Sequence, residues 1–147
     1  MKILVLNAGS STQKSCLYEV NNDTLPISPP APLWEGKIDF TRHQGVAEIE
    51  IETATGAKFT EEIATDSQSQ VMARLLDTMS QGSTKVINQL SEIDVVGHRV
   101  VHGGRKYRLP VVITTEVKDA IANLATLAPA HNPVNLAGIE AIENILG

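Results

Sequence analysis

The spacing of apolar residues changes near Asp66, and this change limits the folds that the chain can adopt. Before it, apolar and polar residues alternate, most strictly over residues 46–52, where isoleucines alternate with three glutamates. Such alternation is typical of half-buried antiparallel strands. After it, apolar residues from Val71 to Met79 recur at helical spacing. The chain is therefore predicted to form an α/β domain in which helices flank a mixed, antiparallel-rich sheet.

The pattern predicts strands and helices in a definite order. The strands cover residues 3–6, 14–20, 33–40, 46–52, 58–64 and 94–101, and the last, rich in valine, is expected to be buried. One helix begins at Asp66-Ser67 and ends at Gly82; others cover residues 85–90, 115–126 and 133–146, the last with Asn132 as its N-cap. A proline-rich loop at 21–32 joins strands, so residues 1–147 are interpreted as one domain.

The first two strands are joined by an unusually polar turn at residues 7–13. Gly9 is expected to adopt backbone angles closed to other residues and to let a ligand approach closely. Hydroxyls and a positive charge surround it, from Ser10, Ser11, Thr12 and Lys14. Exposed amides, hydroxyls and an ammonium group suit a phosphate. The turn lacks the P-loop pattern, and the alternative interpretation is an ordinary hairpin turn rich in serine and glycine.

A second group of functional side chains follows the predicted last strand, in the run Gly97-His-Arg-Val-Val-His-Gly-Gly104. A period of two puts His98, Val100 and His102 on one face, with Arg99 and Val101 on the other. The guanidinium of Arg99 could hold the carboxylate of a short acid in two places, and Val101 could contact its alkyl end. The alternative is an ion pair between Arg99 and one of the 17 acidic residues.

A third group, His131-Asn132-Pro133, stands at the start of the last predicted helix. A helix N-terminus attracts anions, so His131 could donate a hydrogen bond to a phosphoryl oxygen, or it could simply pack at the helix entry. A zinc site made by His98, His102 and His131 is a weaker alternative, because histidines four residues apart face one metal only on a helix. The three glutamates of residues 46–52 are interpreted as a solvated strand face.

Composition excludes several classes of partner. A net charge of −5 and an aromatic content of 3% argue against nucleic acid. No apolar run approaches the ~20 residues of a membrane span, so no membrane partner is expected. The one cysteine, Cys16, is expected to be a small buried hydrophobe in a reducing, cytoplasmic protein.

Together, the three motifs resemble those of the acetate kinases and related short-chain acyl kinases. That family opens with a strand and the pattern N-x-G-S-S-S-x-K, which resembles Asn7-Ala-Gly-Ser-Ser-Thr-Gln-Lys14. Its G-H-R-V-V-H-G-G is matched at every position by residues 97–104, and its A-P-x-H-N-P by residues 128–133. The resemblance implies a ribonuclease H-like fold of the actin, heat-shock-protein-70 and sugar-kinase type, and ATP-dependent phosphorylation of acetate to acetyl phosphate, with the reverse reaction.

The resemblance also implies roles for individual residues. Asn7 would help to hold Mg²⁺ or Mn²⁺, and the phosphates of ATP would meet Ser10, Thr12 and Lys14. Arg99 would bind acetate or acetyl phosphate and take part in catalysis with His131, which would stabilise the transferring phosphoryl group. Val101 and Ala130 would line the acyl pocket.

Two departures from the family pattern affect what the resemblance implies. Ala130 replaces a common leucine, which leaves the preference for acetate, propionate or butyrate open. The chain is also much shorter than members of the family. It is therefore expected to be the N-terminal domain of a homodimeric kinase, without the nucleotide-binding domain, and to be folded but inactive alone.

Overall fold

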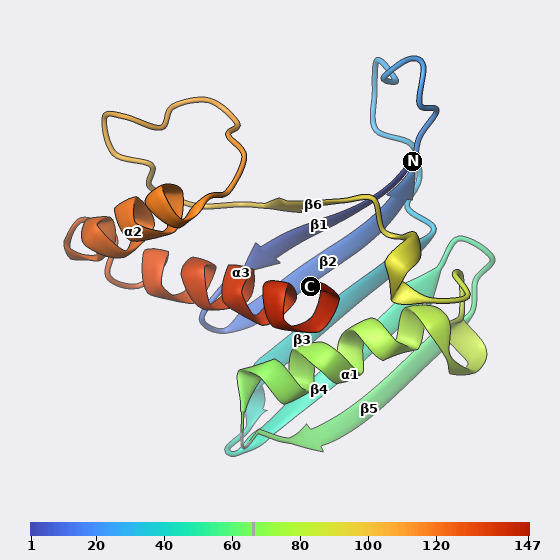
Figure 1. The fold of residues 1–147 in the computed structure, drawn as a ribbon. Coiled ribbons are helices and arrows are strands. Elements are labelled where there is room, and N and C mark those ends of the chain that lie inside the picture. Colours follow the sequence, from blue (N-terminus) through green and yellow to red (C-terminus); the bar gives the residue numbers. More distant parts are fainter. Residues whose placement is uncertain (66) are drawn as a thin grey trace.

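The structure is a computed structural model that describes residues 1–65 and 67–147. In this part of the chain, six strands form one sheet in the order β5-β4-β3-β2-β1-β6 (Figure 1). Strands β1 to β5 form an antiparallel meander, and β6 returns beside β1 in the parallel sense. Their bounds are Lys2–Ala8, Thr12–Glu19, Trp34–His43, Val46–Thr53, Lys58–Ala64 and Val95–His98. The predicted mixed sheet is thus confirmed.

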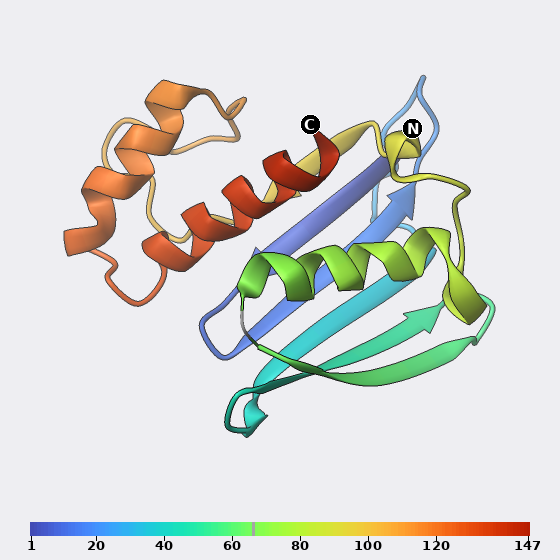
Figure 2. The ribbon, with the colours of Figure 1, turned by 60° about the horizontal axis from the view of Figure 1, so that its bottom comes forward.

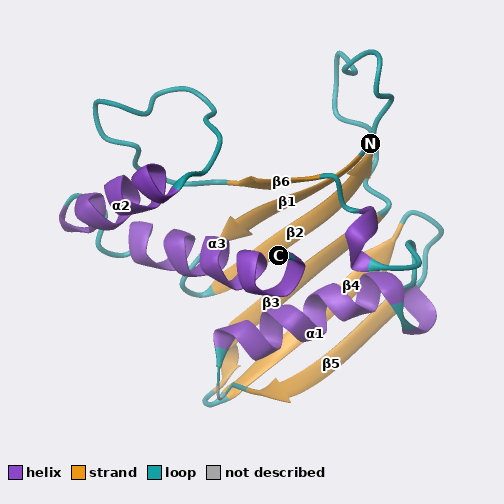
Figure 3. Ribbon diagram, in the orientation of Figure 1, coloured by secondary structure: helices purple, strands orange, loops and turns teal. Residues whose placement is uncertain are grey.

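The helices gather on one side of this sheet. They are α1 (Gln68–Ser80), α2 (Thr115–Asn123) and α3 (Asn132–Leu146), with short 3₁₀ turns at Gly82–Thr84, Leu90–Glu92 and Leu124–Thr126. Figure 2 shows α1 and α3 across the same face, and in Figure 3 these helices lie on the viewer's side of the strands, with no helix drawn behind them. We call the side of the sheet opposite these helices the open face. None of the helices described here has the length and apolar character needed to cross a bilayer.

The core forms where α1 packs on the sheet. The predicted apolar stripe of α1 is buried, and it meets inward-facing side chains of the strands, including Leu4, Leu17 and Ile38. Trp34 is fully buried at the centre, where its indole N–H donates a 3.1 Å hydrogen bond to Thr78 Oγ1. A smaller cluster joins α2 to α3 through Val117, Ile121 and Ile139.

Trp34 also explains why Gly36 has no side chain. The two residues share a strand face, and a Cβ on Gly36 would lie 2.3 Å from the indole Cη2 and 2.9 Å from Leu75 Cδ1. We expect Gly36→Ala to lower the free energy of unfolding by about 2 kcal/mol, because a closely packed core must shift to admit the methyl group. Urea unfolding of the 147-residue chain measures this. Gly97→Ala in β6 is the matched control, because its Cβ would meet only Leu4 O at 4.0 Å; equal losses for both variants would contradict the argument.

Three predictions about secondary structure are wrong. Residues 85–90 form no α-helix, and only Leu90 enters a 3₁₀ turn; the amides of Val86 and Ile87 bond to Met79 O, which folds the segment back against the end of α1. The strand predicted over 94–101 ends at His98, and it is an edge strand with Val95 47% exposed rather than a buried one. The α2 helix ends at Asn123, followed by a 3₁₀ turn.

Other predicted features can be checked residue by residue. Ser67 caps α1 as expected, accepting a hydrogen bond from Gln70 N at 3.3 Å, whereas Asp66 lies outside the described residues. Cys16 is only half-buried, because it lies on the open face. The partial burial that remains raises the pKa of its thiol. The glutamate face of β4 is not wholly solvated: Arg42 lies 2.7 Å from the carboxylate of Glu48, which is largely covered.

Candidate functional site

The polar turn between β1 and β2 is tight. The amide of Gly9 donates a 3.0 Å hydrogen bond to Thr12 O, and a Cβ on Gly9 would lie 2.6 Å from that same oxygen. Gly9 does not have a positive φ, so the predicted need for special backbone angles is wrong. Glycine is required here because two backbone segments come close together. The turn exposes Ser10 and leaves Thr12 half-buried.

Strand alternation brings Asn7 and Lys14 together on the open face. They are direct cross-strand partners in the β1–β2 pairing, and both are exposed. Lys37 of β3 follows as the next partner of Lys14. A shallow groove of about 400 Å³ runs beside Lys14 and Lys37. The side-chain amide of Asn7 and the ammonium group of Lys14 therefore lie on the same face beside the β1–β2 turn.

Arg99 reaches the same place from the other end of the chain. Its backbone N–H donates to Leu6 O at 2.9 Å, which extends the β1–β6 pairing by one residue beyond β6. Its guanidinium donates a 3.4 Å hydrogen bond to Asn7 Oδ1. Among the described residues, no carboxylate lies within 4.0 Å of Arg99, so the alternative of a structural ion pair finds no support. The guanidinium is free to bind an anion.

The prediction that His98 and Val100 face one way and Arg99 and Val101 the other is confirmed, although β6 itself ends at His98. Val100 packs in the cluster between α2 and α3, and His98 lies toward α3, beside Glu143. Arg99 and Val101 are exposed, Val101 by 42%. The two side chains proposed to meet a short acid therefore point away from the core.

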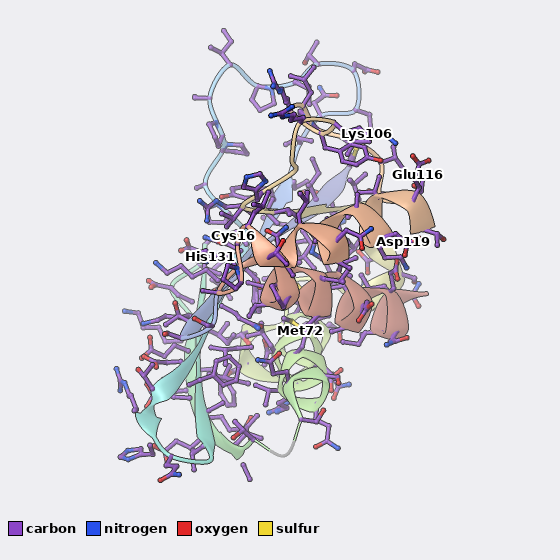
Figure 4. All side chains as sticks on the ribbon, turned by 90° about the vertical axis from the view of Figure 1, so that its left-hand side faces the viewer. Cys16, Met72, Lys106, Glu116, Asp119 and His131 are labelled. Carbon is purple, nitrogen blue, oxygen red and sulfur yellow. The ribbon has the colours of Figure 1, made fainter. Side chains whose placement is uncertain are left out.

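His131 stands at the N-terminal end of α3. It is the N-cap residue and its side chain is exposed. Figure 4 shows it well apart from Lys106 and Glu116, which form an ion pair between the loop after residue 104 and α2. Ala130, just before it, is also exposed. Since α3 packs on β1, with Gly138 against Ala8, its N-terminal end lies toward the β1–β2 turn (Figure 2).

Asn132 does not cap α3, contrary to prediction. Its side chain is completely buried and binds the backbone of His102, accepting from His102 N at 3.2 Å and donating to His102 O at 2.9 Å. Asn135, three residues on, accepts from Val101 N at 3.1 Å and donates to Ala8 O at 2.8 Å. Sequence reasoning missed Asn135. The available signal was two asparagines three residues apart on one helix, a spacing that puts both on the same side.

The histidines do not converge on a metal. His102 Nδ1 accepts a 2.9 Å hydrogen bond from Gly104 N, and His98 lies on the side of β6 toward α3. Across residues 1–65 and 67–147, no three side chains from histidine, cysteine, aspartate or glutamate are grouped so that they could hold a metal ion. The zinc alternative therefore has no support.

His98 should make stability depend on pH. Burial lowers its pKa below the usual 6.5, with the charge of Glu143 acting in the opposite direction. The unfolded chain then binds a proton at a higher pH than the folded chain, so stability falls as the pH drops through about 6.5. We expect His98→Gln to flatten this decline between pH 7.5 and 5.5 in urea unfolding. The exposed His43 gives the control, His43→Gln; a decline equally steep in all three proteins would contradict the role of His98.

The fold and the polar turn define a domain of the actin, heat-shock-protein-70 and sugar-kinase class. Solved structures of this shape include Porphyromonas gingivalis acetate kinase (34% identity, TM-score 0.85, 99% of this chain and 34% of that one). Another is a propionate kinase from Francisella tularensis (27%, TM-score 0.78, 98% and 34%). A sequence profile of the Acetokinase family matches residues 2–147, so the chain belongs to that family.

The relatives are longer than this chain. An acetate kinase from Nostoc punctiforme is 64% identical over 146 residues, which cover 99% of this chain but 36% of that protein. The chain therefore spans about a third of the length of the relatives that it matches.

Proposed function

We propose that residues 1–147 form the N-terminal domain of an acetate kinase, which transfers the γ-phosphoryl group of ATP to acetate and gives ADP and acetyl phosphate, or the reverse. The observation that carries this proposal is the contact of Arg99 with Asn7 on the open face, beside the β1–β2 turn. It joins a group suited to a carboxylate to groups suited to phosphate, and phosphoryl transfer needs both in one place.

The acid end of the site is built from Arg99 and its neighbours. The guanidinium offers a planar pair of N–H donors that match the two oxygens of a carboxylate. The exposed Val101 would contact the methyl group of acetate. The methyl side chain of Ala130 leaves more space than a larger apolar residue would, so propionate is a second candidate substrate.

The phosphate end of the site uses the turn and the start of α3. Ser10 and Thr12 offer hydroxyls and Lys14 an ammonium group, all of which can donate to phosphate oxygens. His131 stands where the free N–H groups of a helix N-terminus favour negative charge. Its imidazole would donate to the transferring phosphoryl group and stabilise the charge that develops there.

The side-chain oxygen of Asn7 is a suitable ligand for a divalent metal ion. Mg²⁺ prefers oxygen ligands and keeps several waters, so one amide oxygen is a suitable protein ligand, and Oδ1 has a lone pair beyond the one that Arg99 uses. When bound, Mg²⁺ or Mn²⁺ would supply positive charge that polarises the phosphoryl oxygens. From the family resemblance, we also infer that the whole enzyme is a cytoplasmic homodimer; one half-buried cysteine suits a reducing compartment.

A chimera tests the proposed function. In it, this chain replaces the matching part of the Nostoc punctiforme acetate kinase, to which it is 64% identical. We expect the chimera to form acyl phosphate from acetate, ATP and Mg²⁺, and the hydroxamate assay would measure its kcat/KM for acetate, propionate and butyrate. A folded chimera that phosphorylates none of these acids would refute the proposal.

A further inference from the structure

Asn135 joins two segments that are far apart in sequence. Its amide N–H donates to Ala8 O, at the end of β1, and its oxygen accepts from Val101 N, beyond the end of β6. The side chain is 3% exposed. A buried amide whose hydrogen bonds both go to backbone groups fixes those groups in space, because leaving any of them unpaired is costly.

The two backbone groups flank the candidate site. Ala8 O directly follows Asn7, the proposed metal ligand, and Val101 follows Arg99, the proposed carboxylate ligand, by two residues. Beyond His98 no strand pairing holds the chain, and Arg99 N makes the last bond to β1. Residues 101 and 102 are therefore held by hydrogen bonds to side chains of α3, Asn135 and Asn132, and not by strand pairing.

We propose that Asn135 is a positioning residue that sets the distance between the acid-binding segment at 99–101 and the β1–β2 turn, and so the width of the acyl pocket at Val101. This inference rests on the proposed function. Asn135 touches no reacting atom; it acts through Val101 and Ala8. Asn132 holds the neighbouring His102 through two hydrogen bonds, and its amide also donates to Ile121 O in α2 at 3.3 Å. Because Ile121 lies outside the proposed site, Asn132 does not connect two parts of that site.

The test compares Asn135→Leu with two controls in the chimera. Leucine has the same number and branching of side-chain heavy atoms as asparagine but bulkier methyl groups, so it leaves no cavity, and it can make neither hydrogen bond. Thr78→Val is the stability control, because it removes the core hydrogen bond to Trp34 far from the site. Asn144→Leu is the surface control, on an exposed position of α3.

We expect Asn135→Leu to raise the KM for acetate about tenfold, the loss of one well-placed contact, while the KM for ATP changes less than twofold. Because the pocket at Val101 loosens, the preference for acetate over propionate should also fall. In the 147-residue chain, hydrogen exchange of the Val101 amide should accelerate, while that of His102, held by Asn132, should not. Neither control should change the ratio of the two KM values.

Two results would overturn the inference. The first is an active chimera in which Asn135→Leu leaves the KM for acetate within twofold of the parent. The second is an equal rise in the KM values for acetate and for ATP that Thr78→Val reproduces, since this would indicate a general effect of reduced stability. A folded parent chimera without activity on any acid refutes the proposed function instead, and the inference falls with it.

Discussion

The 147-residue chain, mixed with ATP, Mg²⁺ and acetate, is expected to form no acetyl phosphate above the uncatalysed background. Every proposed ligand except Thr12 is exposed, and Asn7, Lys14 and Arg99 lie on the open face, which no helix of the described chain covers. Water surrounding such groups weakens each charge contact through dielectric screening. Phosphoryl transfer also depends on holding both substrates in line, which an open surface cannot do.

The measurement compares the isolated chain with the chimera under the same conditions. Enclosure and alignment of substrates can contribute about 7 kcal/mol or more, so we expect at least a 10⁴-fold difference in rate. Circular dichroism and urea unfolding would establish that the isolated chain is folded. A rate for the folded chain within tenfold of the chimera would mean that residues 1–147 hold a complete active site, contrary to our proposal.

Arg99→Ala in the chimera is expected to lower kcat/KM for acetate about a hundredfold, close to 2.7 kcal/mol, as for a lost charge-assisted pair. The guanidinium has no carboxylate partner among the described residues, so its removal should cost little stability. Arg99→Lys should recover only part of the activity, because an ammonium group cannot make two parallel bonds to a carboxylate.

A matched control separates this role from a general charge effect. Arg105 is an exposed arginine six positions further along, outside the proposed site, so Arg105→Ala should leave kcat/KM nearly unchanged. Isothermal titration with acetate would give a second readout for the same pair of variants. Kinetics of Arg99→Ala close to those of the parent would reject the proposed carboxylate contact.

The periodicity of the sequence determined the sheet and the principal helices. Residues 46–52 alternate strictly and form most of β4, and the apolar stripe from Val71 to Met79 is the buried face of α1. Both patterns succeed because they are local: a side chain's face follows from its neighbours two or four positions away. The predicted helix at residues 85–90 failed because contacts with Met79 O, not local preference, decide that segment.

The motifs likewise determined which residues were candidates, but only the tertiary structure decided which of them meet. Arg99 contacts Asn7 across 92 positions of sequence, because β6 pairs with β1 in parallel. Asn132 has the sequence context of a helix cap, yet it binds His102, and Asn135 connects Ala8 to Val101. Buried polar groups must find hydrogen-bond partners, and which partners are within reach depends on how distant segments pack, a choice that no local pattern encodes.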